Sequence, residues 1–369
     1  MNRASIAISV TNDLIQDQRM HRICKTLYDA GYNVTLIGRL RQNSSPIDDK
    51  VYKQVRLRCF FDSGFLFYLE YNLRLLLHLS KHRYEVLYSV DLDTIGAVGT
   101  VARLTGRKHI HDAHEYFVEV PELQGAGFKK WIWNRIAHSF LHRADLRYTV
   151  NEELATELER VYRCPFGVVR SVPEMKNIIS DNTTSKTRIV LYQGVLNKGR
   201  GLETAIKAIV GLDLKVQLHI AGEGDLSEEL RSLAQQIDND NKVVFLGWKL
   251  PHELKELTQQ AWLGINLLDG TSKNYQYSLA NKFFDYMHAE VPSINMAFPT
   301  YKRYIDADKV GLVLDRLDVS KLQVLISELY NDDALYSSMI TSIRNAKQKY
   351  NWKLESKALL SQIKKVIDG

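Results

Sequence analysis

Apolar residues along this chain recur with two alternating periods, one typical of strands and the other typical of helices. Residues 5–10 form a short apolar run, residues 18–30 an amphipathic helical repeat that ends at Gly31, and residues 33–37 a second apolar run. A strand, a helix and a strand in this order predict a βαβ unit with parallel strands. Further strands are predicted at 86–89 and 108–111, with a helix over 94–104 between them.

The same alternation restarts after a polar segment at 174–187, which predicts a linker. Strands are predicted beyond it at 188–193, 216–221, 243–246, 263–267 and 292–294, with helices at 201–210, 227–237, 251–260 and from Ser278 onward. The pattern predicts an α/β fold of two Rossmann-like domains, 1–173 and 188–345. A last segment, 346–369, contains an amphipathic helix at 351–367. Two such domains facing one another would place a cleft between the carboxyl ends of their sheets.

Composition narrows the class of protein. The chain has 369 residues, 45% of them apolar, which suffices for two packed cores. Its three cysteines are scattered without ligand spacing, which disfavours a disulfide scaffold or a structural zinc site and fits a reducing cytosol. We expect neither a transmembrane segment nor a signal peptide. The net charge of +6 is dispersed, which gives nucleic-acid binding little support.

The segment 275–294 predicts a phosphate-binding helix start. Ser278 is expected to be the N-cap, with apolar residues behind it at helical spacing. The first turn of such a helix offers unpaired N–H groups and a positive dipole end. Lys282 and Asp285 share one face, so the cation suits phosphates and the carboxylate suits ribose hydroxyls. The alternative is an ordinary amphipathic helix with a solvated Lys and Asp.

Glycines follow two strands of the second half. Gly194 directly follows the strand at 188–193, and its missing Cβ would let a ligand approach the backbone. Gly222-Glu223-Gly224 follows the strand at 216–221, but Ser227 stands where a dinucleotide fingerprint has its third glycine. An NAD-dependent dehydrogenase is therefore poorly supported.

Six segments carry a resemblance to a known family. They are NDLIQDQRMHRICKTLYDAGYNVTLIGR (12–39), SVDLDTIGAVGTVARLTGRKHIHDAHEYF (89–117), YQGVLNKGRGLETAI (192–206), HIAGEGDLSEEL (219–230), VVFLGW (243–248) and SLANKFFDYMHAEVPSI (278–294). In this order they resemble the GT-B glycosyltransferases, specifically the retaining family 4 enzymes that build bacterial surface polysaccharides. The resemblance implies the GT-B fold, in which the last helix crosses back to the first domain, here with Trp352 at the crossing.

The resemblance also implies a site. Arg200 and Lys282 would grip the donor diphosphate and stabilise its departure without a metal, and His114 would contact the transferred sugar near the reacting carbon. The donor-binding residues would be Gly194, Gly222, Trp248, Tyr277, Ser278, Leu279, Ala280 and Asp285. The alternatives are a solvated Arg200, a Trp248 that packs at the rim, and a structural or solvated His114. We assign His109 and His111 to a strand and give them no role.

Asp17 and Arg19 match a D-x-R pattern in related sequences and are expected on the acceptor side of the cleft. The alternative is a pair of residues on a solvated helix start.

The chain departs from the family where many members carry two glutamates. Asp285 stands at the second position and Tyr277 at the first, and a tyrosine supplies no carboxylate charge. The identity of the sugar is therefore open. Asp269 could substitute, although a turn role is favoured. Glu290 and Ala280 stand where glycine and proline are common.

The expected reaction moves a sugar from a nucleotide diphosphate, UDP in preference to GDP, to a glycan hydroxyl with retention. The departing phosphate would take the acceptor proton, so we expect no metal and no cofactor. Rival functions are a nucleotide-sugar epimerase of the same fold and a non-catalytic sugar-binding protein of two lobes.

We expect a lipid-linked acceptor and a cytoplasmic enzyme peripheral to the inner membrane face. Residues 125–148 combine lysines and arginines with tryptophans on one predicted helix, which favours an anionic membrane surface. For the leucine-rich segment 60–79 we favour a helix that faces the core.

Overall fold

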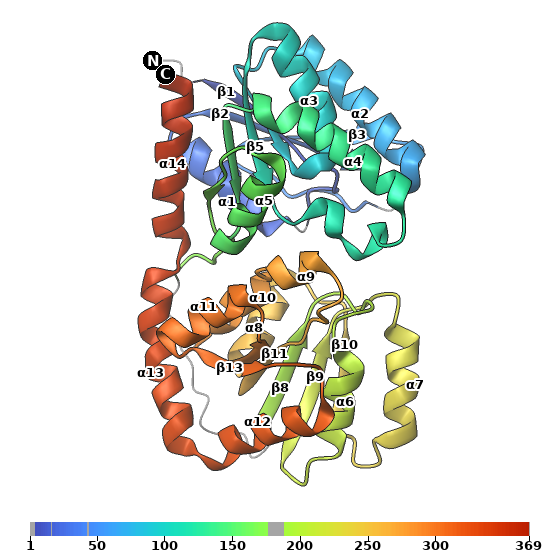
Figure 1. Ribbon diagram of the computed structural model, residues 1–369, viewed down its shortest axis with the longest axis vertical. Coiled ribbons are helices and arrows are strands. Elements are labelled where there is room, and N and C mark those ends of the chain that lie inside the picture. Colours follow the sequence, from blue (N-terminus) through green and yellow to red (C-terminus); the bar gives the residue numbers. More distant parts are fainter. Residues whose placement is uncertain (1–3, 16, 43, 176–187, 369) are drawn as a thin grey trace. The chain divides into compact units, whose positions relative to one another are not determined.

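The computed structural model describes residues 4–15, 17–42, 44–175 and 188–368, and the chain divides into two compact units (Figure 1). The first contains the residues up to Ser171 together with those from Glu355 onward, and the second runs Val172–Leu354. Residues 176–187 of the predicted linker lie outside the described residues.

A parallel sheet in the order β3-β2-β1-β4-β5-β6-β7 forms the centre of the first unit. Its strands are β1 (Ser5–Ser9), β2 (Asn33–Leu40), β3 (Lys53–Arg58), β4 (Val86–Val90), β5 (Lys108–Ala113), β6 (Leu146–Thr149) and β7 (Gly167–Val168). The central pairs β1–β4 and β4–β5 are in register over Ile6↔Val86 and Val86↔Lys108. This arrangement brings the carboxyl ends of β4 and β5 together at one edge of the sheet.

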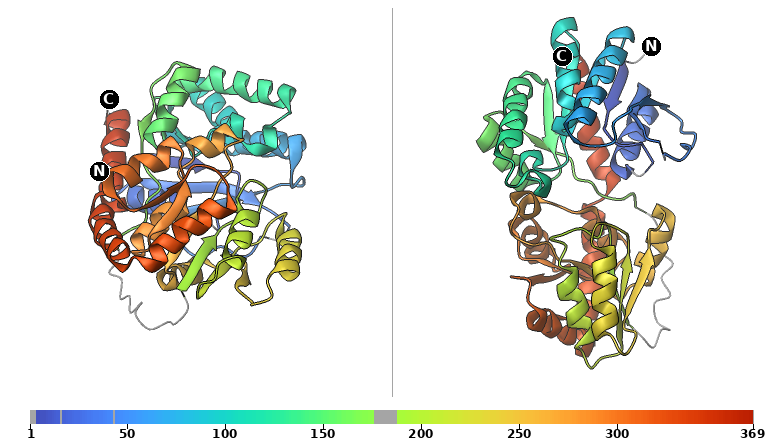
Figure 2. Two further views of the ribbon diagram at one scale, coloured as in Figure 1. Left: turned by 60° about the horizontal axis from the view of Figure 1, so that its bottom comes forward. Right: turned by 90° about the vertical axis from the view of Figure 1, so that its right-hand side faces the viewer.

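Helices cover both faces of this sheet (Figure 2). They are α1 (Gln18–Asp29), α2 (Gly64–Lys81), α3 (Asp91–Thr105), α4 (Gly127–Phe140) and α5 (Glu152–Tyr162). The expectation that 60–79 faces the core is only half right, because α2 buries one face in the core and exposes the other. None of the helices in the described part of the chain is long and apolar enough to cross a membrane.

The prediction of one basic helix over 125–148 is wrong. The helix α4 ends at Phe140 and is followed by a 3₁₀ turn, Leu141–Arg143, and by β6. Arg147 lies in β6, where its guanidinium donates to the carbonyls of Leu141 and Pro165 at 2.8 Å and 3.0 Å. Pairing of β6 with β5 therefore takes the last part of the segment into the sheet.

The second unit is built on a parallel sheet in the order β10-β9-β8-β11-β12-β13. Its strands are β8 (Arg188–Gln193), β9 (Val216–Ala221), β10 (Val243–Gly247), β11 (Leu263–Asn266), β12 (Ser293–Met296) and β13 (Gly311–Leu314). Its helices are α6 (Leu202–Val210), α7 (Ser227–Ile237), α8 (Pro251–Gln260), α9 (Lys273–Tyr277), α10 (Asn281–His288), α11 (Pro299–Asp308), α12 (Val319–Asn331) and α13 (Asp333–Lys349). Buried Tyr286 joins α10 to the sheet, since its hydroxyl donates to the carbonyl of Leu191 at 2.8 Å. The two parallel sheets confirm the α/β class.

The C-terminal helix α14 (Trp352–Asp368) returns to the first unit, as expected. The Glu355 carboxylate accepts the backbone N–H and a guanidinium N–H of Arg170, each at 2.9 Å. Trp352 is buried, and its backbone N–H donates to the carbonyl of Pro173 at 2.9 Å. The cysteines Cys24, Cys59 and Cys164 are free and buried.

Candidate active site

The loops after β8 and β9 approach each other so closely that a side chain does not fit between them. Gly194 has φ of +133° and Gly222 has φ of +152°, backbone conformations that favour glycine. A Cβ on Gly222 would lie 1.9 Å from the carbonyl oxygen of Gly194, and one on Gly194 would lie 3.4 Å from Nζ of Lys282. Gly222 therefore lets the two loops meet, and Gly194 keeps a side chain away from the ammonium of Lys282.

Lys282 is a nearly buried cation in the first turn of α10, with an exposed fraction of 8%. Nζ lies 3.8 Å from the centroid of the Tyr192 ring, and the described residues supply it with no hydrogen-bond acceptor. Burial and then repulsion from Arg200 lower the pKa of Lys282 well below its ordinary value, against the opposing effect of Asp285. An anion bound beside Nζ would therefore strongly favour the charged ammonium.

Arg200 supplies a second cation. It precedes Gly201, the N-cap of α6, and its guanidinium carbon lies 5.0 Å from the centroid of the Tyr275 ring. Its Nε is buried and has no hydrogen-bond partner among the described residues, so Arg200 is not the solvated residue of the alternative interpretation. Two cations beside helix N-termini can hold a diphosphate.

Ser278 is not the N-cap of α10, contrary to the prediction. It caps the end of the short helix α9, where its hydroxyl donates to the carbonyl of Tyr275 at 2.9 Å. The N-cap is Ala280, whose N–H donates to the hydroxyl of Tyr301 at 3.1 Å. The backbone at Ser278 and Ala280 is extended, so α10 begins later than its apolar period suggests.

The other predicted donor residues differ in exposure. Asp285 lies one helical turn after Lys282 and accepts from Nε2 of Gln193 at 3.1 Å. Trp248 follows β10 and is exposed, Leu279 is buried, and Tyr277 is half-buried.

Two departures from the family pattern have structural explanations. Asp269 has the expected turn role, since its Oδ1 accepts from the N–H and the hydroxyl of Thr271 at 3.2 Å and 2.7 Å. Glu290 has φ of +61°, which explains why glycine suits its position, and it pairs with Arg344 at 2.6 Å.

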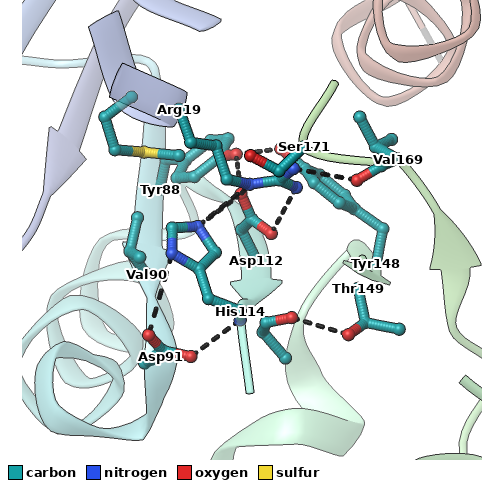
Figure 3. A network of polar contacts seen from close by, with 12 residues as sticks. Arg19, Tyr88, Val90, Asp91, Asp112, His114, Tyr148, Thr149, Val169 and Ser171 are labelled. Atoms are coloured by element: carbon teal, nitrogen blue, oxygen red, sulfur yellow. Dashed lines mark hydrogen bonds and ion pairs between the residues drawn. The ribbon is translucent and has the colours of Figure 1, made fainter. Parts of the chain in front are cut away.

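In the first unit, His114 belongs to a polar network at the carboxyl ends of β4 and β5 (Figure 3). Nε2 of His114 and Nε of Arg19 lie 3.1 Å apart, and each lies 3.1 Å from Oδ2 of Asp112. An N–H group of Arg19 also donates to Oδ1 at 3.0 Å, and the Tyr88 hydroxyl donates to Oδ2 at 3.0 Å. Several donors thus converge on one fully buried carboxylate.

This network favours a charged imidazole. Burial alone would lower the pKa of His114, but the carboxylates of Asp112 and Asp91 outweigh it and raise that pKa to about 9. Asp91 accepts the backbone N–H of His114 at 2.8 Å, and its Oδ2 lies 3.9 Å from Nδ1. Burial opposes ionisation of Asp112, but Arg19 and His114 lower its pKa. Burial raises the pKa of Asp91 well above its ordinary value, so Asp112 is the carboxylate that stays charged. Beside it, the protonated ring can donate from both nitrogens at neutral pH.

Asp17 and Arg19, the two residues predicted on the acceptor side, have separate structural roles. Asp17 is the N-cap of α1, accepting from the N–H of Met20 at 3.0 Å and from Nδ2 of Asn12 at 2.7 Å. Arg19 has an exposed fraction of 4%, so it is not on a solvated helix start. The structure joins Arg19 to His114, a link that the sequence analysis missed.

Asp91 was missed as well, although a signal for it existed. It directly follows β4, whose parallel neighbour β5 leads into His114. Residues that end adjacent parallel strands meet at one edge, so the strand pattern could have placed Asp91 beside the histidine.

Two family models match consecutive parts of the chain. Residues 16–174 match the model described as Glycosyltransferase Family 4, and residues 175–346 match Glycosyl transferases group 1. No curated protein sequence matches the chain.

Solved structures with the same fold cover nearly the whole chain. A sucrose-phosphate synthase from Thermosynechococcus elongatus is 18% identical with a TM-score of 0.81, covering 99% of both chains. HepE from Anabaena, in complex with UDP and glucose, is 12% identical with a TM-score of 0.77, covering 98% of this chain and 99% of its own. WaaG, described as involved in lipopolysaccharide biosynthesis, is 15% identical with a TM-score of 0.74, covering 96% and 98%. The fold is GT-B.

Proposed function

The chain belongs to the group 1, family 4 glycosyltransferases, and on that premise we propose that it moves a sugar from a nucleoside diphosphate sugar to a glycan hydroxyl with retention. The observation that carries the proposal is the pair of cations in the second unit. Lys282 is nearly buried with its pKa lowered, and Arg200 has a buried Nε for which the described part of the chain supplies no acceptor. A diphosphate supplies the negative charge and the acceptor oxygens that both cations lack.

We favour UDP as the nucleotide. Support comes from HepE, which is described in complexes with UDP, with UDP-glucose, and with UDP and glucose. The carboxylate of Asp285, one turn after Lys282, would accept bonds from the ribose hydroxyls, and exposed Trp248 would lie by the base. Tyr277 would offer its hydroxyl to the sugar where many relatives carry a carboxylate.

The proposed mechanism uses no dedicated base. As the bond from the anomeric carbon to the phosphate breaks, Arg200 and Lys282 stabilise the charge that develops on the diphosphate. The departing phosphate oxygen takes the proton of the acceptor hydroxyl, which attacks from the same face. His114 would donate a hydrogen bond to the transferred sugar, with Arg19 acting through Asp112 to hold the ring. We propose that no metal takes part.

We propose a lipid-linked glycan as the acceptor and a peripheral site on the inner face of the cytoplasmic membrane. The description of WaaG as an enzyme of lipopolysaccharide biosynthesis supports this class of acceptor. On α4 the rings of Phe128 and Trp131 are exposed, while Lys130 pairs with Glu119. The membrane-facing part of 125–148 is thus its first half.

Thermal unfolding with a panel of nucleotides tests the donor site. A nucleotide at 100 times its dissociation constant should add about 2.7 kcal/mol to the free energy of unfolding. We expect UDP or UDP-sugars to shift the melting temperature, and Lys282→Ala and Arg200→Ala each to remove the shift. Lys207→Ala, an exposed position on α6, is the matched control. A shift that survives both substitutions would refute the diphosphate site.

Product analysis separates transfer from the epimerase alternative. With donor and acceptor present, a transferase forms a new glycosidic bond whose anomeric configuration NMR can read, whereas an epimerase converts the donor without an acceptor.

A further inference from the structure

The helix α2 carries apolar residues on two opposite faces. Its inner residues pack in the core of the first unit and recur every fourth position: Phe67, Tyr71, Leu75 and Leu79. Its outer leucines have exposed fractions between 46% and 56%: Leu66, Leu69, Leu73 and Leu77. A helix that is apolar on both sides is either enclosed by protein or in contact with an apolar medium. In Figure 1, α2 lies at the outer margin of the first unit.

Aromatic rings extend the outer surface at the start of α2. Phe60 and Phe65 are strongly exposed. The N–H groups of Phe60 and Phe61 donate to the Glu70 carboxylate at 2.8 Å and 3.0 Å, and the Arg74 guanidinium carbon lies 5.1 Å from the centroid of the Phe60 ring. These contacts hold the preceding loop against the helix. We define the α2 face as Phe60, Phe65, Leu66, Leu69, Leu73 and Leu77.

Charges around the α2 face favour one kind of occupant. Arg58 precedes Phe60, and three exposed basic or potentially basic residues follow at the end of the helix, Lys81, His82 and Arg83. The exposed carboxylates there are Asp62 and Glu85, of which Glu85 accepts from the backbone N–H and the hydroxyl of Ser5 at 2.7 Å and 3.2 Å. Glu70 is paired with Arg74 at 2.8 Å, and the basic residues still outnumber the exposed carboxylates. A net positive rim attracts anionic lipid headgroups and repels the identical rim of a second copy. The charges therefore favour a membrane over self-association.

We propose that the α2 face lies in the interfacial layer of an anionic membrane, with its leucines and phenylalanines below the headgroups. Amphipathic helices with apolar and aromatic side chains and basic ends bind membranes in this way. The helix α4 would add a second contact, because Tyr68 of α2 packs edge to face on Trp133 of α4 at 5.3 Å. The inference deepens the proposed lipid-linked acceptor and rests on it for its biological purpose.

Vesicle co-sedimentation tests the α2 face. The probes are vesicles of phosphatidylglycerol mixed with phosphatidylcholine, and vesicles of phosphatidylcholine alone. We expect the wild type to bind the anionic vesicles and the double variant Leu69→Asp, Leu73→Asp to lose at least about tenfold in affinity. The matched control is Val324→Asp, at a position on α12 with an exposed fraction of 64%, which should bind as the wild type does.

Two results would overturn the inference. One is unchanged vesicle binding by the double variant. The other is a wild type that does not bind anionic vesicles. If that wild type forms a dimer that the double variant breaks, the α2 face is a contact between copies and not a membrane surface. Circular dichroism and the UDP-induced melting shift verify that each variant is folded, and the milder Leu73→Asn replaces the double variant if it is not. A wild type that binds vesicles but no nucleotide would contradict the donor site and leave the α2 face standing.

Discussion

Replacing Asp112 with asparagine tests whether this carboxylate keeps His114 charged. Asparagine preserves the shape of the side chain and removes its charge. Burial, which by itself lowers the pKa of His114, would then be opposed mainly by Asp91. We expect the pKa of His114 to fall from about 9 toward or below its ordinary 6.5. Arg19, with an exposed fraction of 4%, loses its ion-pair partner in the same variant.

The magnitude follows from the two pKa values of His114. A folded-state pKa of about 9 against 6.5 in the unfolded chain means that folding favours the protonated ring. That contribution is fully present below the unfolded pKa and is lost as the pH rises through the folded one. At roughly 1.36 kcal/mol per pKa unit, it amounts to about 3 kcal/mol. Loss of the buried ion pair with Arg19 lowers the free energy of unfolding of the variant by a further amount of about 3–5 kcal/mol, and this amount depends little on pH in this range.

Urea unfolding at about pH 6 and about pH 10 separates these two contributions. Asp112→Asn should be the less stable protein at both, and its deficit should be larger at the lower pH by about 3 kcal/mol. NMR titration of the imidazole C–H signals gives the pKa directly, and the strand residues His109 and His111 serve as internal references because burial lowers their pKa to about 4 and about 3. A wild-type His114 that titrates at or below 6.5, or a deficit independent of pH, would refute the reasoning.

Other substitutions probe single contacts. Gly222→Ala should destabilise the protein by more than about 2 kcal/mol in urea unfolding, because its Cβ would lie 1.9 Å from the Gly194 carbonyl oxygen. Asp93→Asn should raise the melting temperature at about pH 8 and not at about pH 4. Burial raises the pKa of Asp93 to about 7, so above that pH the folded state contains a buried carboxylate charge that the substitution removes. Lys282→Met should stabilise the free protein by about 1 kcal/mol, by removing a buried cation, while abolishing the UDP-induced melting shift. Ser278→Ala should cost less than about 1 kcal/mol, because the hydroxyl makes one turn contact at 2.9 Å and a long contact to the Tyr301 hydroxyl at 3.4 Å, and caps no helix start.

Local pattern predicted most of the second unit, because its strands are apolar runs and its helices have clear apolar periods. In the second unit it predicted the elements only as far as β12, missing α9, which is too short to show a period, and the elements from α11 to α13. In the first unit it missed β3, whose residues are half-buried or exposed, and β6, α5 and β7. Ser278 was wrongly predicted as the N-cap of α10 because α9 was not predicted, and the hydroxyl of Ser278 donates to a carbonyl of α9 instead. Arg200, Gly194 and Gly222 were accessible from sequence because each stands at a strand end or a helix start. The link from Arg19 to Asp112 was not, since the two residues are 93 positions apart and only the tertiary fold brings them together.

The two charged clusters differ in where their counter-charge comes from. His114 and Arg19 are cations compensated by the protein itself, through the buried carboxylate of Asp112, so their charge is a property of the folded first unit. For Lys282, burial and repulsion from Arg200 both disfavour the charged ammonium, and only Asp285 among the causes of its pKa shift favours it. A protein that keeps such a cation gives up stability, and the cost is offset when an anion from solution binds. This imbalance supports the proposal that the second unit binds an anion, while His114 would serve as a hydrogen-bond donor held in place by Asp112.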